Sequence, residues 1–256
     1  MRRYRFLFEQ LVRRELRQKY QGSALGIAWY VVNPLVLMGA YYLLFGVLFP
    51  PARVADFPLF LMVGLVVWLF FSQSLLQAAS SLLDQGALIR KARFPRESVP
   101  AAVVTVQLVT FLAVLALVAV VEVAVRGTLG APLLVLPLLL AALYAFTLGL
   151  ALVVAVLHAY FRDVAPILSA VLLPWFFLSP IFYRPADVAS EHAWARDVLR
   201  WVNPVAPFIE SIRGVLYAGT WPSGAALLYV VAAAALALAG GRALFRRLEA
   251  ELAVVV

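Results

Sequence analysis

Cysteine is absent from this chain of 256 residues, and charged residues are scarce in it. Without cysteine, the chain has no disulfide, no thiolate zinc site and no cysteine nucleophile. Charged residues make up 13% of the sequence and hydrophobic residues 65%, whereas a soluble domain is about half apolar and about a quarter charged. So few charges cannot keep so much apolar surface in water. The composition therefore predicts an all-α protein that folds in a lipid bilayer, where helices satisfy their own backbone groups.

The sequence also lacks the motifs of familiar enzymes. It contains no Gly-x-x-x-x-Gly-Lys-Ser/Thr loop for ATP, no His-Glu-x-x-His and no Gly-x-Ser-x-Gly. Its two histidines, His158 and His192, have no metal-ligand neighbour at a useful spacing. For His158, a hydrogen-bonded structural role is favoured over a proton relay. We therefore expect no enzyme activity, no cofactor and no metal site in this chain.

Acidic residues are almost missing from the apolar runs, where Glu122 is the only one. Ion-coupled carriers place ionisable side chains near the middle of the membrane, because the coupling ion must be bound and released there. This scarcity disfavours a carrier driven by protons or sodium. If the protein moves a solute uphill, we expect the energy to come from another chain.

Long uncharged windows are what the sequence does contain. A membrane-spanning helix needs about 20 apolar residues, and six windows are long enough: 20–52, 57–83, 98–121, 127–161, 164–183 and 214–241. The pattern predicts six transmembrane helices in one membrane domain, residues 1–256. The fifth window contains Pro166, Pro174 and Pro180, so we expect an interior, kinked or partly re-entrant span.

The basic residues predict the orientation. The net charge is +8, with 19 arginines and two lysines. If the N-terminus is cytoplasmic, 15 of these 21 basic residues lie on the inner side and six on the outer side. Because cytoplasmic loops carry the excess of Arg and Lys, we expect a multi-pass protein of the inner membrane with both termini cytoplasmic. No cleavable signal peptide is visible. We attribute the basic excess to membrane orientation and expect no nucleic-acid partner.

Residues 1–22 form the first of three segments outside the expected spans. Its apolar residues recur at helical spacing between arginines: Tyr4, Leu7, Phe8, Leu11 and Val12. This pattern predicts an amphipathic helix in the inner headgroup layer. The alternative is an ordinary basic anchor.

The second segment, residues 84–98, is an inner loop that begins D-Q-G-A-L-I-R-K-A-R-F-P-R. It is long for a turn between two spans and holds four positive charges. One interpretation is a short docking helix for a cytoplasmic partner, and the other is a solvated basic loop.

The third segment, residues 184–223, lies on the outer side. Two apolar patterns at helical spacing predict two short helices, interfacial or re-entrant, between the fifth and sixth spans. The first comprises Trp194, Val198, Trp201 and Val202, and the second Phe208, Ile209, Ile212 and Leu216. These helices either gate an exit or only pack on the bundle for stability.

Aromatic residues are abundant in the spans. Trp and Tyr concentrate at membrane interfaces, so an interfacial belt explains many of them. The alternative is a pathway wall, because flat aromatic faces bind sugar rings without charge; Tyr41 and Phe71 lie deepest and are the better pathway candidates. The full set is Trp29, Tyr30, Tyr41, Tyr42, Trp68, Phe70, Phe71, Trp175, Phe176, Phe177 and Tyr183.

Several segments resemble one known family in order along the chain. The run Arg13–Leu35 reads R-R-E-L-R-Q-K-Y-Q-G-S-A-L-G-I-A-W-Y-V-V-N-P-L. It is followed by Ile89–Glu97, Tyr160–Val164, Ser179–Tyr183 and Asn203–Phe208. Together these segments resemble the membrane permeases of polysaccharide ABC exporters, type-2 ABC transporters that export O-antigen, capsule or teichoic-acid chains.

The resemblance implies that the permease forms a homodimer and binds two copies of a separate ATPase subunit, which carries ATP and Mg²⁺. The N-terminal helix and the inner loop would contact that ATPase. The coupling residues implied in this way are Arg14, Glu15, Arg17, Arg90, Lys91, Arg93, Phe94 and Arg96.

The resemblance also implies a lipid-linked glycan as substrate, with membrane lipids around the protein. Its glycan would pass aromatic side chains, namely Trp29, Tyr30, Tyr41, Trp68, Phe71, Trp175, Phe176 and Tyr183. Its pyrophosphate head would meet basic residues near the inner face, for which Arg5, Arg13, Arg14 and Arg17 are the candidates.

Two other functions stay open. One is a related ABC permease that exports a drug or a lipid. The other is a membrane enzyme or scaffold that works without an ATPase. A membrane glycosyltransferase would need clustered acidic residues to hold a metal, and Asp84, Asp163 and Asp187 are scattered.

Overall fold

The computed structural model describes residues 2–20, 28–48, 56–91, 94–127, 130–187, 194, 197–249 and 252. Within these ranges the regular structure is helical and no strand occurs, as the composition predicted. The α-helices are α1 (Arg2–Tyr20), α2 (Trp29–Tyr42), α3 (Phe57–Asp84), α4 (Gly86–Lys91), α5 (Ser98–Arg126), α6 (Leu136–Tyr160), α7 (Val164–Leu178), α9 (Ala206–Leu216) and α10 (Gly224–Leu248). Shorter turns of other helix types are η2 (Leu43–Leu48), η3 (Ala131–Val135), η4 (Pro185–Asp187) and η6 (Val198–Val202).

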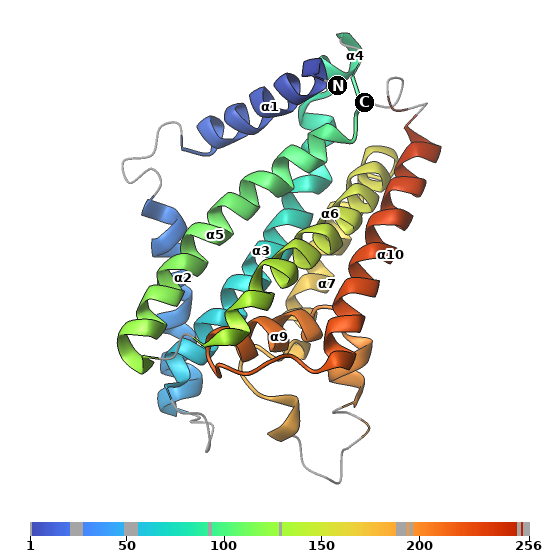
Figure 1. Cartoon of the computed structure of the whole chain (residues 1–256). Coiled ribbons are helices and arrows are strands. Elements are labelled where there is room, and N and C mark those ends of the chain that lie inside the picture. Colours follow the sequence, from blue (N-terminus) through green and yellow to red (C-terminus); the bar gives the residue numbers. More distant parts are fainter. Residues whose placement is uncertain are drawn as a thin grey trace.

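Among the described residues, four helices are long and apolar enough to cross a membrane: α3, α5, α6 with the preceding η3, and α10. In their most apolar stretches, 78% of the residues are buried in α3 and 61% in α6, against 28% in α5 and 22% in α10. The core therefore lies along α3 and α6, and α5 and α10 flank it (Figure 1). These helices make the chain a polytopic membrane protein.

The first and fifth windows form shorter helices than the sequence predicted. The apolar helical stretch of the first is Val32–Leu48, which contains Pro34 and ends in the π-helical η2. Helix α7 has 15 residues and is about 22 Å long at 1.5 Å per residue, less than the roughly 30 Å of the hydrocarbon core. Much of its surface is exposed in the single chain, including Ile167 and Leu173, so the interior position expected for it is not seen there.

The sixth window begins later in the structure than in the sequence pattern. Its first residues belong to α9, which continues to Leu216, and the chain then turns at Gly219 with φ of +61°. Helix α10 starts at Gly224, where Ser223 Oγ accepts a hydrogen bond from the Ala226 amide at 3.2 Å. The helix also runs past Gly241 to Leu248. The arginines of its last turns are exposed.

Small residues bring α6 and α10 together. A Cβ at Gly149 would collide with the backbone of Ala237, and a Cβ at Gly241 would collide with the backbone of Gly149. In lipid the hydrophobic effect does not drive helices together, so close packing of their backbones is a main source of helix association. This contact fixes α10 beside the core.

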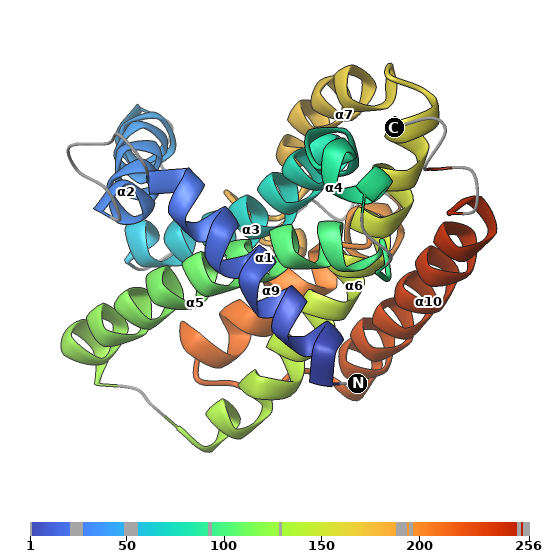
Figure 2. The same ribbon diagram turned by 90° about the horizontal axis from the view of Figure 1, so that it is seen from above.

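The two ends of the bundle differ. Figure 1 shows α1, α4 and the last turns of α10 at one end, and α9 lying across the helices near the other. Figure 2 shows α1 crossing over the end of the bundle, and α1 packs on α5. We call the first end, where α1, α4, residues 94–97 and residues 242–249 meet, the basic end. The other is the α9 end.

Candidate functional site

Helix α1 is amphipathic, as the sequence predicted. Leu11 is buried and Leu7, Phe8 and Val12 are half-buried, whereas Arg13 and Arg14 are exposed. The apolar side faces the bundle because apolar area removed from the solvent stabilises the contact.

Hydrogen bonds join α1 and the other segments of the basic end. Gln85 Nε2, at the end of α3, donates to Glu15 Oε1 of α1 at 3.1 Å. The Tyr160 hydroxyl donates to the Leu248 carbonyl at 2.6 Å, and the Arg96 guanidinium donates to the Glu249 carbonyl. The segments that the arginine distribution assigned to one side of the membrane thus meet at one end of the molecule.

The predicted coupling residues lie around this end. Arg90 and Lys91 are exposed at the end of the six-residue α4, which buried Gly86 and Ile89 hold against the bundle. The remaining residues fall into three groups: Arg14 and Arg17 are exposed; Glu15, Phe94 and Arg96 are half-buried; and Arg93 lies outside the described residues. The short helix expected in this loop is therefore present as α4, and its docking role stays a prediction.

The arginines predicted to contact a pyrophosphate head all lie on α1. Arg13, Arg14 and Arg17 of α1 are exposed, and the side chain of Arg5 lies outside the described part of the chain. Nothing in the geometry tests this role.

Many of the predicted pathway aromatics gather in one cluster inside the chain. Trp68 and Phe71 of α3 lie 6.0 and 5.3 Å from Trp175 of α7, measured between ring centroids. Tyr41 of α2 lies 5.4 Å from Phe176. These separations and tilted geometries are typical of favourable aromatic pairs. The cluster continues through Phe146 of α6, which lies 5.9 Å from Phe71 and 5.1 Å from Phe208 of α9.

Burial divides the predicted pathway residues into two groups. Trp68, Phe71 and Phe176 are buried within the single chain. Tyr41, Trp175 and Tyr183 are half-buried, and Trp29 is 51% exposed. The side chain of Tyr30 lies outside the described residues. In this conformation, therefore, only the second group presents surface to a neighbour.

Asn203 links the end of α7 to the start of α9. Its Nδ2 donates to Ser179 Oγ at 3.0 Å and to the Leu178 carbonyl at 3.3 Å. Its Oδ1 accepts from Trp175 Nε1 at 2.9 Å and from the Val205 amide at 3.1 Å. A buried side chain amide with this many partners fixes the two segments relative to each other.

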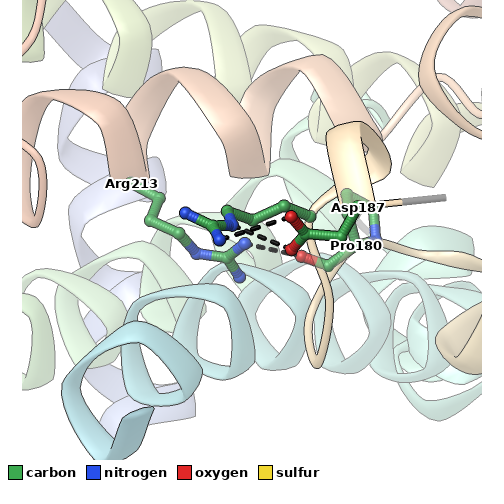
Figure 3. A network of polar contacts seen from close by, with 4 residues as sticks. Pro180, Asp187 and Arg213 are labelled. Carbon is green, nitrogen blue, oxygen red and sulfur yellow. Dashed lines mark hydrogen bonds and ion pairs between the residues drawn. The ribbon is translucent and has the colours of Figure 1, made fainter. Parts of the chain in front are cut away.

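Arg213 of α9 adds a charged contact at the same place (Figure 3). It is buried, and its guanidinium donates to the carbonyls of Pro180 at 2.7 Å and Ile181 at 3.1 Å. The guanidinium also lies 3.7 Å from the ring centroid of Phe60, and Gly64 of α3 leaves the space for it. Burial lowers the pKa of Arg213 to about 9, with nearby Glu210 opposing the change. The group therefore stays charged at neutral pH.

Sequence reasoning missed this role of Arg213. It is one of the six basic residues that the expected orientation places on the outer side, and it falls on the apolar face of the second predicted helix, four residues after Ile209 and three before Leu216. An arginine at that register on an otherwise apolar face indicates a buried charge with partners. The pattern itself is confirmed, since Phe208, Ile209, Ile212 and Leu216 are all buried.

The first pattern of the outer segment packs less well. Within the described residues, Val198–Val202 forms a π-helical turn, and Trp194 and Asp197 are also helical. Trp194, Val198 and Val202 are exposed, and Trp201 lies 5.7 Å from the ring of Tyr229.

His158 has the structural hydrogen bond that we expected, because its Nδ1 accepts from the Ala165 amide at 3.3 Å.

Comparison with protein families gives a match over most of this architecture. The family model described as ABC-2 type transporter matches residues 7–217, from α1 to the turn after α9. The chain belongs to the ABC-2 type transporter family. Permeases of this family lack an ATPase domain of their own.

Individual relatives cover nearly the whole permease. It is 32% identical over 250 residues to the O-antigen export system permease protein RfbA of Myxococcus xanthus, which covers 98% of this chain and 95% of the relative. It is 28% identical over 220 residues to the protein of the same name from Klebsiella pneumoniae, covering 84% and 83%. It is 25% identical over 246 residues to the polysialic acid transport protein KpsM of Escherichia coli, covering 94% and 93%.

Proposed function

We propose that this ABC-2 permease is the membrane subunit of an ATP-driven polysaccharide exporter. It moves a lipid-linked glycan of the O-antigen, capsule or teichoic-acid type from the cytoplasm to the outer face of the inner membrane. The observation that carries the proposal is the similarity over nearly the full length to a permease named for O-antigen export. Similarity to a polysialic acid transport protein over 94% of the chain supports the same substrate class.

The proposed topology has six passes, with both termini in the cytoplasm. Helices α3, α5, α6 and α10 supply four of them, and α2 with η2 and α7 with the turn after it supply the other two. The basic end then faces the cytoplasm, which agrees with the excess of arginine there. Helix α1 lies in the inner headgroup layer, and α9 lies at the outer interface.

A separate ATPase supplies the energy in this proposal. Two permeases pair with two ATPase subunits, and ATP and Mg²⁺ bind to the ATPases. The exposed Arg90 and Lys91 of α4 and the exposed Arg14 and Arg17 of α1 are suited to pair with carboxylates of the partner. Because α4 follows the end of the central helix α3, a displacement of α4 would be transmitted directly to the core.

The glycan passes aromatic side chains on the way out. Trp29, Tyr41, Trp175 and Tyr183 offer partly exposed faces, and Trp68, Phe71 and Phe176 support them from inside the cluster until the helices separate. The pyrophosphate head is held by arginines of α1, since guanidinium groups bind phosphate through two parallel hydrogen bonds.

The test of coupling is a charge reversal at Arg90, Lys91 and Arg93 together, to Glu. The permease is co-expressed with its ATPase, and polymer at the cell surface is measured beside ATP hydrolysis by the purified complex. We expect hydrolysis to continue while export falls, because the contact that transmits the movement has become repulsive. The matched control is Arg246→Glu with Arg247→Glu, two exposed residues of the same end, which should export normally.

Two outcomes contradict different parts of the proposal. Normal export by the triple variant would reject the docking role of α4. Unchanged surface polymer after removal of the whole permease would reject the substrate class itself.

A further inference from the structure

A cavity of 230 Å³ lies at the basic end between four helices. Phe8 of α1 forms one wall, Ala101 of α5 a second, and Leu148 and Leu152 of α6 a third. The cavity is smaller than the roughly 300–1,000 Å³ of pockets that hold drug-sized ligands. It therefore suits a headgroup rather than a saccharide chain.

Two opposite charges line the polar side of this cavity, Glu97 before α5 and Arg242 of α10. Glu97 Oε2 and Arg242 Nε are 3.8 Å apart, whereas charge-assisted hydrogen bonds of this kind are about 2.7–2.9 Å long. Within the described part of the chain, the Oε2 atom is shielded from solvent and accepts no hydrogen bond. The pair is close enough to attract, but the separation leaves the Glu97 oxygen without a donor, so a ligand that brings a donor to Glu97 and an acceptor to Arg242 would gain from binding beside them.

The position of the cavity indicates where this ligand comes from. Glu97 immediately precedes the apolar stretch of α5, which starts at Ser98, and Arg242 lies in the last two turns of α10. Both residues thus lie at the edge of the apolar part of the bundle, the level of lipid headgroups. Leu148 and Leu152 add an apolar wall beside the charged pair, as the glycerol and first methylenes of a lipid next to its headgroup would require.

We propose that this cavity binds the phosphoethanolamine headgroup of a membrane phospholipid. The ammonium group donates hydrogen bonds to Glu97, and a phosphate oxygen accepts from Arg242. The glycerol and the first methylenes pack on Leu148 and Leu152. Because Phe8 forms the wall from α1, the bound lipid would hold this helix against α5 and α10.

The charges select among the available headgroups. An anionic lipid such as phosphatidylglycerol would bring a net negative charge beside Glu97 and offer that carboxylate only neutral hydroxyl donors, which form weaker hydrogen bonds than an ammonium group. Phosphatidylcholine has the same net charge as phosphatidylethanolamine, but its quaternary ammonium has no N–H to donate. The difference between these two zwitterionic lipids therefore isolates the contact with Glu97. The proposal goes beyond the exported substrate and does not depend on it.

The test uses the purified full-length permease in nanodiscs of equimolar phosphatidylethanolamine, phosphatidylcholine and phosphatidylglycerol. Native mass spectrometry of the released protein counts the lipids that stay bound. We expect retention of phosphatidylethanolamine to exceed that of phosphatidylcholine by about tenfold, as one charge-assisted hydrogen bond would give. Equal retention of the two lipids, or preferred retention of phosphatidylglycerol, would overturn the proposal without any variant.

Variants then assign the preference to the two side chains. Glu97→Met, which has no oxygen to accept a hydrogen bond, should abolish the discrimination between the two zwitterionic lipids, and Arg242→Gln should lower the retention of both. Arg246→Gln, an exposed arginine of the same helix that does not line the cavity, should behave as the wild type. A Glu97→Met permease that still prefers phosphatidylethanolamine would place the lipid elsewhere.

Discussion

Arg213 is held by carbonyls rather than by a carboxylate. Its guanidinium donates to Pro180 and Ile181 and lies over the ring of Phe60. Main-chain carbonyls and an aromatic face stabilise a cation without placing a second full charge in an apolar region, where the loss of hydration is costly. The residue thus joins α9, α3 and the turn after α7.

Replacing Arg213 by Met should destabilise the permease by on the order of 3 kcal/mol, because two buried carbonyls lose their donor. Thermal unfolding in detergent, followed by tryptophan fluorescence, measures the change. The matched control is Arg200→Met, which removes an arginine whose pair with Glu210 at 3.1 Å is partly exposed and should cost less than about 1 kcal/mol. Equal unfolding midpoints for the two variants would show that Arg213 does not stabilise the contact between α9, α3 and the turn after α7.

The chemistry of these contacts was hidden in the sequence. Asn203 and Ser179 belong to segments that we singled out only because they resemble a family, and the pattern gave no reason for either residue. Their hydrogen bonds join positions that are 24 residues apart. Periodicity describes one helix at a time and does not state which loop meets which helix.

At the scale of elements, the glycines of α6 and α10 have unequal roles. A Cβ added at Gly241 would collide with the backbone of Gly149, whereas a Cβ added at the neighbouring Gly240 would meet open space. The same substitution at these adjacent positions therefore separates helix packing from helix propensity.

We expect Gly241→Ala to lower the unfolding midpoint, because the added methyl group forces α6 and α10 apart. Gly240→Ala should leave it unchanged or raise it slightly, since alanine favours a helix over glycine by up to about 1 kcal/mol. Thermal unfolding of the two variants in the same detergent measures the difference between their midpoints. A loss of stability at both positions would mean that the crossing is not where the structure has it.

Element boundaries were predictable where charges mark them and not elsewhere. Helix α3 fills its whole predicted window, 57–83, and includes Asp84, because Asp56 and Asp84 mark its two ends. The sixth uncharged window opens ten residues before α10 begins, since no charge separates Gly214 from Gly224 and the reversal depends on the backbone at Gly219. Hydropathy alone cannot distinguish one long apolar helix from a short one followed by a turn.

At the scale of the whole molecule, the absence of cysteine makes the proposed topology directly testable. Single cysteines can be placed at Lys91 of α4 and at Thr220 near the α9 end, both exposed, in an otherwise cysteine-free chain. In intact cells, a membrane-impermeant maleimide that enters the periplasm should label Thr220→Cys and not Lys91→Cys. After permeabilisation both should react. Labelling of Lys91→Cys in intact cells would invert the proposed orientation.

The sequence predicted which segments meet at the basic end, because the distribution of arginine follows the side of the membrane. It could not predict which aromatic side chains face inward. The spans are apolar on all sides, so no amphipathic stripe marks the inner face. The buried Trp68 and the exposed Trp29 had the same standing in the sequence.

The site of Arg213 also has a consequence for biosynthesis. Its parts come from residues 60–64, 180–181 and 213, so it cannot be completed until more than four fifths of the chain has left the ribosome. Until then, no guanidinium occupies the space beside Gly64, and the earlier helices lie in the membrane without the contacts that Arg213 makes. A ribosome that stalls before this codon would leave an inserted but unsecured protein, which is a natural substrate for membrane quality-control proteases.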